Sequence, residues 1–311
     1  MKKTYAIGLD IGGTHITVAV IDIVDMKVLN FSLHKEFYDS NLPAVEVMDI
    51  WKNAIRISWD KSGVKELAGI AISVPGPFDY ANGICWIKDQ AKYEHFYSLN
   101  IRELIRKRFN FSDDFNILFD NDANCFGKGE FFKNAKNSCK KLMAVTLGTG
   151  LGASFIDDGK AIDSGTQVPA NGELYNIPFK EGIAEDYVSV RGLLSHYHRV
   201  SGVKVSNGLE LFNLANTGDI MALKVFEEMG KNLAEIVIPW LKHFEADCFV
   251  IGGKIANSGD YFLPSFKEKI KNSGSEVTVL FSIDNEVAAL LGAASLLCNV
   301  QHSLFKEFVQ E

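Results

Sequence analysis

Near its start the chain reads Tyr5-Ala6-Ile7-Gly8-Leu9-Asp10-Ile11-Gly12-Gly13-Thr14, and β-branched residues resume from Ile16 to Ile21. The apolar run predicts a strand, the glycine pair a tight turn, and the second run a strand that returns beside the first. A similar segment follows later, where Leu142 to Leu147 leads into Gly148-Thr149-Gly150-Leu151-Gly152 and then into Ala153 to Ile156. Two glycine-tipped hairpins far apart in one chain predict a duplicated lobe.

Strands and helices alternate along the rest of the chain, which predicts a layered α/β fold. Further strands are expected at residues 67–74, 116–119 and 248–251, and helices at residues 44–59, 101–109, 184–197, 220–243, 260–271 and 286–298. We expect Pro239 to kink or interrupt the longest of these helices.

The expected lobes are residues 1–121, to which a final helix at about 290–311 is expected to return, and residues 122–289. Ligands of such sheets bind in a cleft at the carboxyl ends of the strands. We therefore expect the functional residues where the strands end.

The composition is that of an ordinary globular protein. The chain has 311 residues, of which 47% are hydrophobic and 23% charged, so it can bury a sizeable core in two lobes. Its net charge of -7 comes without a long basic run that would attract a nucleic-acid backbone. DNA binding is therefore disfavoured.

The cysteines indicate a reducing compartment. Their odd number and scattered spacing predict reduced thiols rather than a disulfide framework or a structural zinc site. They are Cys85, Cys125, Cys139, Cys248 and Cys298. The run after Met1-Lys2-Lys3-Thr4 is too brief for a signal peptide, and no later segment is apolar enough to span a bilayer. We expect a cytoplasmic protein with no membrane contact.

The two glycine turns can bind phosphate. Gly12, Gly13 and Thr14 let backbone N–H groups approach a phosphate closely, and Asp10 offers a carboxylate to a hydrated metal ion. A single turn of this kind is more often an ordinary hairpin turn. The partner loop Gly148, Thr149 and Gly150 favours the phosphate interpretation, because two such loops can hold one triphosphate. A P-loop is excluded, since no Gly-Lys-Ser/Thr ends either loop.

Asp120-Asn121-Asp122-Ala123-Asn124 ends an apolar strand and begins a predicted helix. Asp122 is the candidate general base, and a base that accepts a hydroxyl proton during phosphoryl transfer accelerates it by roughly 10²- to 10⁴-fold. The alternative is a helix cap, which is common for Asp and Asn at such junctions. The two roles are compatible.

Two further glycine positions are candidates. Gly76 lies in the turn Ser73-Val74-Pro75-Gly76-Pro77-Phe78-Asp79, where its backbone could meet a ligand hydroxyl, although the segment by itself is only a turn. Gly252 and Gly253 follow a strand, and there a nucleotide contact and a simple strand-to-helix connection are equally supported.

Together these residues resemble the ROK family of sugar kinases and sugar-responsive regulators, over nearly the whole chain. The resemblance implies a two-lobed, actin-like ATPase (ribonuclease H-like) fold, with ATP and Mg²⁺ as cofactors. It implies phosphate loops at Gly8 to Thr14 and at Gly148 to Gly152, an adenosine segment at Gly252-Gly253, Asp122 as base and Asn121 as sugar ligand.

The chain departs from the family at a Gly-Glu-Leu-Gly-His stretch, whose histidine and three nearby cysteines bind zinc. Here the stretch reads Gly172-Glu173-Leu174-Tyr175-Asn176, and no cysteine lies between Cys139 and Cys248. An asparagine cannot replace the imidazole ligand, so we expect no structural zinc. Glu173 and, in Gly182 to Tyr187, Glu185 match the family's sugar-binding carboxylates; otherwise both would be solvated surface acids.

The predicted function is an ATP-dependent carbohydrate kinase, a phosphotransferase with an alcohol group as acceptor. Two alternatives stay open: a sugar-sensing regulator acting through a partner protein, and an actin-like ATPase without a sugar substrate. Regulators of the family carry a DNA-binding domain before the first loop, and this sequence has no room for one there. The sequence does not distinguish glucose, N-acetylglucosamine, N-acetylmannosamine and fructose. Related kinases suggest a homodimer.

Overall fold

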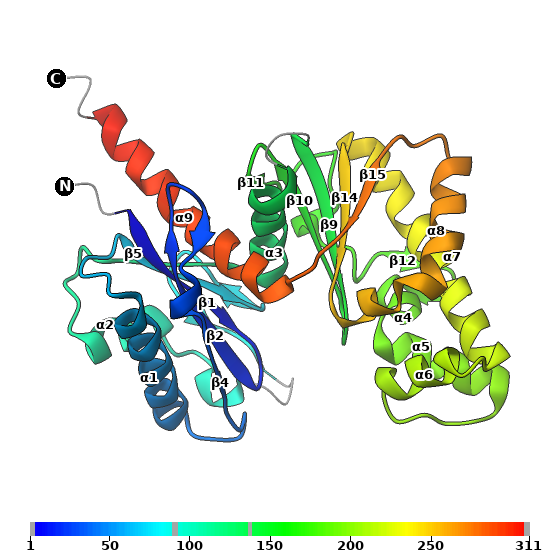
Figure 1. Ribbon diagram of the computed structural model, residues 1–311, viewed down its shortest axis with the longest axis horizontal. Coiled ribbons are helices and arrows are strands. Elements are labelled where there is room, and N and C mark those ends of the chain that lie inside the picture. The colour runs from blue at the N-terminus through cyan, green and yellow to red at the C-terminus, as the bar shows by residue number, and fades with distance from the viewer. Residues whose placement is uncertain (1–3, 89–92, 136–138, 308–311) are drawn as a thin grey trace. The chain divides into compact units, whose positions relative to one another are not determined.

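The computed structural model describes residues 4–88, 93–135 and 139–307, with side chains undescribed at 134–135 and 299–307 (Figure 1). Met1 to Lys3 and the last four residues of the predicted returning helix therefore lie outside the described part. The chain forms two compact units. Unit 1 extends to Lys133 and resumes at Glu286, and unit 2 spans Asn134 to Asn285. The units differ from the predicted lobes mainly in the helix that follows residue 121, which belongs to unit 1 and not to the second lobe. The limits of the lobes stay a prediction.

Unit 1 consists of one large sheet with helices on both faces. Its strands and helices are β1 (Tyr5–Ile11), β2 (His15–Asp22), β3 (Lys27–Val28), β4 (His34–Phe37), α1 (Ala44–Ser62), β5 (Gly69–Val74), β6 (Phe78–Asp79), β7 (Ile84–Cys85), α2 (Ile101–Phe109), β8 (Asn116–Asn121), α3 (Asp122–Glu130) and α9 (Asn285–Glu307). Short 3-10 turns occur at Asn30–Ser32 and Glu94–Phe96, and a π-helical turn at Phe131–Ala135.

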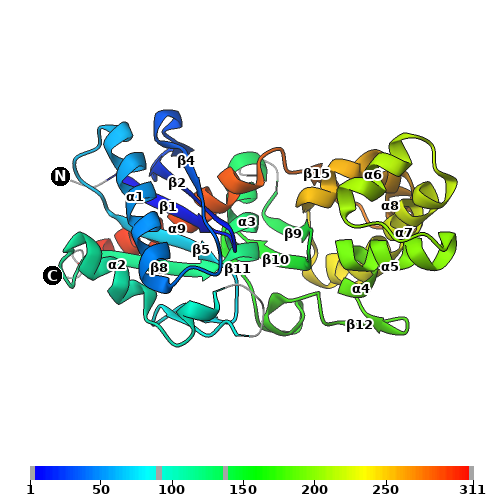
Figure 2. The same ribbon diagram turned by 90° about the horizontal axis from the view of Figure 1, so that it is seen from below.

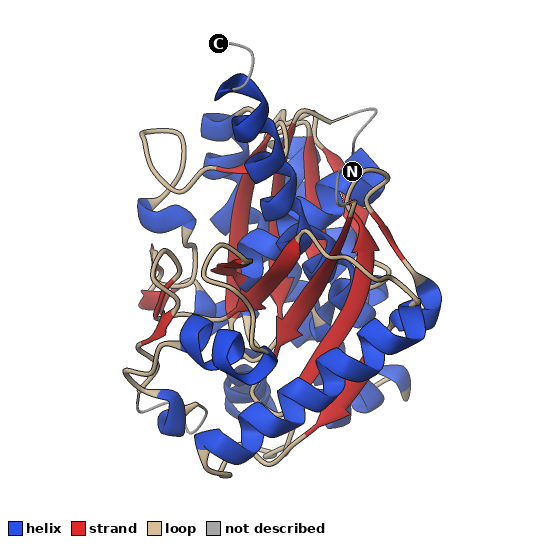
Figure 3. Cartoon of the chain, turned by 90° about the vertical axis from the view of Figure 1, so that its left-hand side faces the viewer, coloured by secondary structure: helices blue, strands red, loops and turns tan. Residues whose placement is uncertain are grey.

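The sheet of unit 1 has the strand order β3-β2-β1-β5-β8, with β4 also paired to β2. β1 and β2 form the predicted antiparallel hairpin, whereas β1, β5 and β8 run parallel. Apolar residues of α1 and α2 pack on one face, and those of α9, with Cys125 of α3, pack on the other (Figure 1). Figure 3 faces this unit and shows helices on both sides of its strands.

Helices α3 and α9 approach closely through glycines. A side chain at Gly292 would place its Cβ 1.7 Å from the carbonyl oxygen of Cys125, and one at Gly129 would place it 1.7 Å from that of Ala288. Such separations are far below van der Waals contact. The two helices can therefore pack at this distance only because both positions lack side chains.

Unit 2 is built around a second sheet. Its strands and helices are β9 (Lys141–Leu147), β10 (Leu151–Asp157), β11 (Lys160–Ala161), β12 (Pro178–Phe179), β13 (Gly182–Ile183), α4 (Glu185–Val188), α5 (Val190–Ser201), α6 (Gly208–Asn216), α7 (Ile220–Phe244), β14 (Cys248–Gly252), α8 (Gly259–Asn272) and β15 (Thr278–Phe281). Short 3-10 turns occur at Ala170–Gly172 and Lys254–Ser258.

The sheet of unit 2 repeats the pattern of unit 1. Its order is β11-β10-β9-β14-β15, with β9 and β10 antiparallel and β9, β14 and β15 parallel. Helices α7 and α8 lie side by side, and their apolar faces share one core with β9, β10 and β14 (Figure 2). The predicted duplication of a glycine-tipped hairpin with a layered α/β fold is confirmed.

Two helix predictions need correction. Helix α7 continues through Pro239 without interruption. Proline has no N–H group to donate to the carbonyl of Glu235, but both residues face solvent, where water can bond that carbonyl. The helix expected at residues 184–197 is divided into α4 and α5 at Ser189. The backbone of Ser189 is extended, and its Oγ accepts a hydrogen bond from the N–H of Gly192, so Ser189 caps α5. Among the described helices, none has the length and apolar character needed to cross a membrane.

The prediction that all cysteines are free thiols is wrong for one pair. Cys139 and Cys248 form a disulfide with their Cα atoms 6.0 Å apart, while Cys85, Cys125 and Cys298 are free. The pairing arises because Cys139 lies just before β9 and Cys248 begins β14, and these two strands are neighbours in the sheet. The separation of 109 residues in sequence gave no sign of it.

Candidate active site

Three polar residues form a row across the parallel strands of unit 1. Asp10 of β1 is level with Ser73 of β5, and Ser73 is level with Asp120 of β8. All three lie near the carboxyl ends of their strands. The Oγ of Ser73 donates a hydrogen bond to Oδ1 of Asp10 at 2.8 Å and so fixes the orientation of that carboxylate. Ser73 is fully buried.

The surroundings of Asp10 disfavour its negative charge. Burial raises the pKa of Asp10 to about 7, and the neighbouring carboxylates of Asp122 and Glu286 add to this effect, against the opposing hydrogen bond from Ser73. Asp122 and Glu286 thus add negative charge near Asp10, and Lys35 opposes it. A cation bound there would relieve the repulsion.

Asp120 and Asp122 have different surroundings, although the sequence places them two residues apart. Oδ2 of Asp120 pairs with Nζ of Lys128 at 2.6 Å, in an ion pair whose side chains are both largely buried. Its Oδ1 accepts from the N–H of Asn121 at 2.8 Å and from Nδ2 of Asn124 at 3.4 Å. Asp120 is thus neutralised and held in place within the protein.

Asp122 is the first residue of α3. Its Oδ1 lies 2.9 Å from the N–H of Ala123, in the first turn, where the positive end of the helix dipole favours a carboxylate. Asp122 therefore directly follows the end of β8, and its charge acts on Asp10.

Asn121 caps α3 and contacts a tyrosine. Its Oδ1 accepts from the N–H groups of Ala123 and Asn124, at 3.0 and 3.4 Å, while its Nδ2 donates to Oη of Tyr80 at 3.2 Å. The same hydroxyl would lie 3.3 Å from a Cβ at Gly76. The predicted site residues Gly76 and Asn121 are therefore joined through Tyr80.

The first glycine turn is held by tyrosine hydroxyls that bond its carbonyl groups. Oη of Tyr38 donates to the carbonyl of Gly12 at 2.6 Å, and Oη of Tyr93 donates to that of Ile11 at 2.9 Å. The N–H groups of Gly13 and Thr14 have no acceptor within the described part of the chain. The turn thus offers backbone donors of the kind that bind phosphate oxygens.

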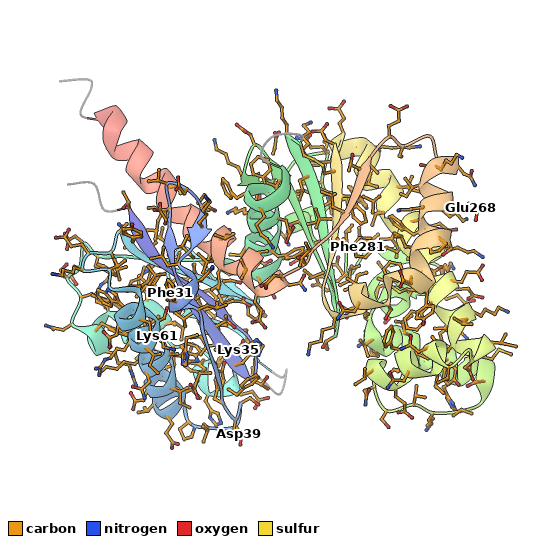
Figure 4. The ribbon with its side chains drawn as sticks, in the orientation of Figure 1. Phe31, Lys35, Asp39, Lys61, Glu268 and Phe281 are labelled. Atoms are coloured by element: carbon orange, nitrogen blue, oxygen red, sulfur yellow. A yellow bond between two sulfur atoms is a disulfide. The ribbon has the colours of Figure 1, made fainter. Side chains whose placement is uncertain are left out.

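A charged network connects this hairpin to α9. Glu286, in the first turn of α9, accepts from Oγ1 of Thr17 at 3.1 Å, forms an ion pair with Lys35 of β4, and lies 3.7 Å from Nε2 of His15. Lys35 is labelled in Figure 4. Burial alone would raise the pKa of Glu286, yet the pKa is lowered because Lys35, Thr17 and His15 stabilise the carboxylate. The network fixes both β2 and β4 to α9.

In unit 2 the second glycine turn connects β9 and β10. The N–H of Gly148 bonds the carbonyl of Gly150 at 3.0 Å, and the N–H of Val190 bonds the carbonyl of Gly148 at 2.9 Å. Among the residues that the structure describes, the N–H groups of Thr149 and Gly150 have no acceptor. Gly148 has open space where a side chain would be. The geometry parallels that of the first turn.

Glu185 lies against this second turn. Its Oε2 accepts from the N–H of Leu151 at 3.0 Å, and its Oε1 lies 3.4 Å from Arg191. A side chain at Gly150 would place its Cβ 2.6 Å from that Oε2. Glu185 therefore supports the loop, which the sequence did not predict.

Glu173 follows the turn Ala170–Gly172, whose residues Asn171 and Gly172 have left-handed backbone conformations. No partner for its half-buried carboxylate occurs in the described ranges. Glu173 and Glu185 both lie near Tyr175, since their charges raise the pKa of its phenol, with Glu173 the largest cause. The structure thus brings the two predicted carboxylates of unit 2 to one region.

Gly252 and Gly253 lie where β14 ends. Gly253 has φ of 86°, and a Cβ there would come within 2.3 Å of the carbonyl oxygen of Leu147. Its N–H donates to Oδ1 of Asn285 at 3.0 Å. Only glycine fits at this position, next to the end of the strand that leads into the second glycine turn.

The residues present fit a hydrated magnesium ion better than a fully protein-bound metal. Within the described ranges, no group of three or more His, Cys, Asp or Glu side chains is arranged to hold a metal. Mg²⁺ usually binds one or two carboxylates together with waters and substrate phosphates. Asp10, in its negative surroundings, is a suitable carboxylate of that kind.

Sequence reasoning did not identify Ser73, Tyr80, Tyr38, Tyr93 or Glu286 as parts of these sites. Ser73 and Glu286 could be found only from strand register and tertiary contact. Each unit carries its own share of the predicted residues: Asp10, the first glycine turn, Gly76, Asn121 and Asp122 lie in unit 1, and the second turn, Gly252, Gly253, Glu173 and Glu185 in unit 2.

Curated relatives align with most of the chain. It is 25% identical to a glucokinase of Thermotoga maritima, over 96% of this chain and 98% of that protein. It is also 25% identical to an N-acetyl-D-glucosamine kinase of Haemophilus influenzae, over 80% of this chain and 84% of the kinase. A xylose repressor of Caldicellulosiruptor bescii is 22% identical, over 94% of this chain and 76% of the repressor.

Solved structures of similar fold include a ROK hexokinase from Thermus thermophilus, with a TM-score of 0.79 and 20% identity over 96% of this chain and 99% of the hexokinase. A ROK family glucokinase from Streptomyces griseus, solved with glucose and AMPPNP, has a TM-score of 0.71 and 21% identity over 94% and 98% of the two chains. The chain therefore has the two-lobed, actin-like ATPase fold. The ROK family model matches residues 6–300, so the chain belongs to the ROK family.

Proposed function

We propose that the protein is an ATP-dependent sugar kinase, which transfers the γ-phosphate of ATP to a hydroxyl of a hexose or N-acetylhexosamine. The observation that carries this proposal is the register of Asp10, Ser73 and Asp120 across β1, β5 and β8, with Asp122 two residues beyond Asp120, in a member of a family that includes named sugar kinases. Phosphoryl transfer needs a metal-binding carboxylate and a second carboxylate that accepts the hydroxyl proton.

Asp122 is the proposed general base. The neighbouring Asp120 is paired with Lys128 and bonded to two further donors, so its oxygens are engaged within the protein. Asp122 begins α3, directly after the end of β8. It lies in the first turn of α3, where the positive end of the helix dipole favours a carboxylate.

Asp10 is the proposed magnesium-binding carboxylate, acting through water. Bound magnesium would neutralise the charge of the phosphates that it contacts. Ser73 orients the Asp10 carboxylate, and the N–H groups of Gly13 and Thr14, together with the predicted nucleotide residues of unit 2, would bind ATP. The AMPPNP complex of the Streptomyces glucokinase supports ATP as the phosphate donor.

The proposed sugar ligands are Gly76, Asn121, Glu173 and Glu185. Support is strongest for Glu173, whose carboxylate has no partner in the described part of the structure and can accept from sugar hydroxyls. Asn121 has its oxygen engaged in capping α3, so its Nδ2 group is the part that can contact the sugar. Glu185 retains only part of its hydrogen-bonding capacity, because Leu151 and Arg191 contact it.

A sugar-sensing regulator is the second candidate, because the xylose repressor is among the relatives and Asn176 replaces the family's histidine. A regulator would bind sugar without consuming ATP. An ATPase without a sugar substrate would consume ATP at a rate that no sugar changes.

The test is ADP release from ATP and Mg²⁺ with a panel of glucose, fructose, N-acetylglucosamine and N-acetylmannosamine, in the presence of a zinc chelator that spares Mg²⁺. Turnover that depends on one sugar supports the kinase and names its substrate. Sugar binding by calorimetry without turnover supports the regulator, and ATP turnover unaffected by every sugar supports the ATPase.

A further inference from the structure

Unit 2 contains a cavity of about 290 Å³ that none of the predicted site residues line. It lies among α4, α5 and α7. Arg191, Ser195 and Arg199 of α5 line it at intervals of four residues, which places them along one face of that helix. Asp186 of α4, His196 of α5 and Asn232 of α7 line it as well.

Asn232 presents hydrogen-bond donors to the cavity. The residue is buried, with 6% of its surface exposed, and its Oδ1 accepts a hydrogen bond from Nζ of Lys180. Its Nδ2 group has no acceptor among the described residues. Because Asn232 lines the cavity, a ligand bound there could accept the hydrogen bonds of this group.

Lys180 is held firmly beside Asn232. It lies in the turn between β12 and β13 with a left-handed φ of 51°, and its Nζ lies 5.2 Å from the ring centre of Phe179 and 5.4 Å from that of Tyr187. Cation–π contacts on two rings and the bond to Asn232 fix the ammonium group. The cavity thereby gains a positive charge close to its wall.

Two carboxylates near the cavity, those of Glu185 and Asp186, share Arg191, and a second arginine has no partner among the described residues. Asp186 pairs with Arg191 at 3.0 Å, and Glu228 lies 3.2 Å from Nε2 of His196. Arg199 has no ion pair or hydrogen bond with any residue that the structure describes, and neither has the hydroxyl of Ser195. The unmatched groups at this cavity are therefore all hydrogen-bond donors.

His196 lies among both cations and a carboxylate at this cavity. Burial lowers the pKa of His196, and the charges of Arg199, Lys180 and Lys224 lower it further, against the opposing effect of Glu228. Burial is the largest cause of the lowered pKa of His196, and Glu228 is the largest charged influence on it.

We propose that this cavity is a binding site for a phosphate group, held by the guanidinium of Arg199, the hydroxyl of Ser195 and the Nδ2 of Asn232. A tetrahedral dianion accepts hydrogen bonds from several directions, which suits donors that converge from two helices. The volume exceeds that of inorganic phosphate, so a small phosphomonoester is the chemical class that the cavity accommodates. The site is independent of the proposed kinase activity, because it contains none of the residues assigned to that activity.

The test is calorimetric titration of the whole protein with inorganic phosphate, in the presence of saturating AMPPNP and Mg²⁺ to occupy the proposed nucleotide site. A saturable heat is expected. Arg199→Glu should weaken phosphate binding by about tenfold or more, because it removes a charge-assisted hydrogen bond and adds repulsion. The matched control is Lys204→Glu, an equal charge change on an exposed residue shortly after α5, which should leave the affinity unchanged.

A second variant tests the buried amide. Asn232→Leu keeps the approximate shape but removes the donors, and it should weaken phosphate binding while circular dichroism shows an unchanged fold. Titration with glucose 6-phosphate distinguishes the sources: tighter binding than inorganic phosphate that is weakened in Arg199→Glu identifies a phosphomonoester site, and equal binding a free-phosphate site. No saturable heat in the wild type, or equal affinity in Arg199→Glu and Lys204→Glu, would overturn the proposal.

Discussion

Ser73 donates its hydroxyl hydrogen to Oδ1 of Asp10 at 2.8 Å, and this bond connects the central parallel strands β5 and β1 at the proposed magnesium site. Ser73→Ala should free the carboxylate to rotate and so weaken its contact with hydrated magnesium. Loss of a residue that orients a metal ligand typically costs about 10- to 100-fold in metal affinity or activity. We expect a higher Mg²⁺ requirement in the sugar-dependent assay, with little change in sugar KM.

Ser58→Ala is the matched control for that variant, because Ser58 is also a fully buried serine of unit 1 but lies on α1. It should leave the Mg²⁺ requirement unchanged. Equal Mg²⁺ requirements in Ser73→Ala and wild type would show that the bond to Asp10 has no role in metal binding.

Asp122→Asn should lower sugar phosphorylation by roughly 10²- to 10⁴-fold, because the amide cannot accept the hydroxyl proton. The melting temperature should change little, since an asparagine can still cap the first turn of α3. Initial rates and a thermal melt measure both effects. Near-full turnover in this variant would eliminate Asp122 as the base.

Asp120→Asn should instead destabilise the protein. It leaves the buried ammonium of Lys128 without its carboxylate, and breaking such a pair typically costs about 3–5 kcal/mol of unfolding free energy. Lys128→Met in the Asp120→Asn background should restore part of that stability, because it removes the uncompensated charge. Denaturant unfolding of the two single variants and the double variant measures the coupling, and additive losses would argue against the pair.

Gly292→Val should separate α3 from α9. A Cβ at this position meets the carbonyl of Cys125 at 1.7 Å, so the helices must move apart, at a cost of about 1–3 kcal/mol or more. Gly208→Ala is the comparison, because a Cβ there meets Val190 at an ordinary 3.4 Å. Equal melting temperatures for the two variants would contradict the close helix contact.

The pH dependence of His196 follows from its lowered pKa. The folded state prefers the neutral imidazole, so the stability from this group is present above the unfolded pKa of about 6.5 and is lost as the pH falls through the lower folded pKa. Arg199→Gln should raise that folded pKa, because it removes a nearby cation. NMR titration of the imidazole in both proteins checks the shift, and an unchanged pKa would show that Arg199 does not affect His196.

The sequence predicted the two hairpins and the layered α/β fold, because apolar runs and glycine turns are local signals. It did not predict α6, the division at Ser189 or the uninterrupted path of α7 through Pro239, since capping and solvent exposure decide those features. The disulfide between Cys139 and Cys248 depends on β9 and β14 being neighbours, which spacing in sequence does not reveal.

The site residues, like the fold, could be predicted where the signal is local and not where it depends on tertiary contacts. Residues within glycine turns and at strand ends, such as Asp10 and Asp122, could be proposed from the chain itself. Ser73, Tyr80 and Glu286 could not, because each reaches its site through strand register or a long-range contact. The difference between Asp120 and Asp122 likewise required the position of Lys128, which is close in sequence but gives no signal of its pairing.

The most direct test of the proposed activity is phosphorus NMR of ATP incubated with Mg²⁺, the protein and each sugar of the panel in turn. The account predicts that one sugar gives a new phosphomonoester resonance, growing in step with ADP, and that Asp122→Asn does not produce it. ADP appearing with free phosphate alone, or no ATP consumption with any sugar of the panel, would contradict the sugar kinase.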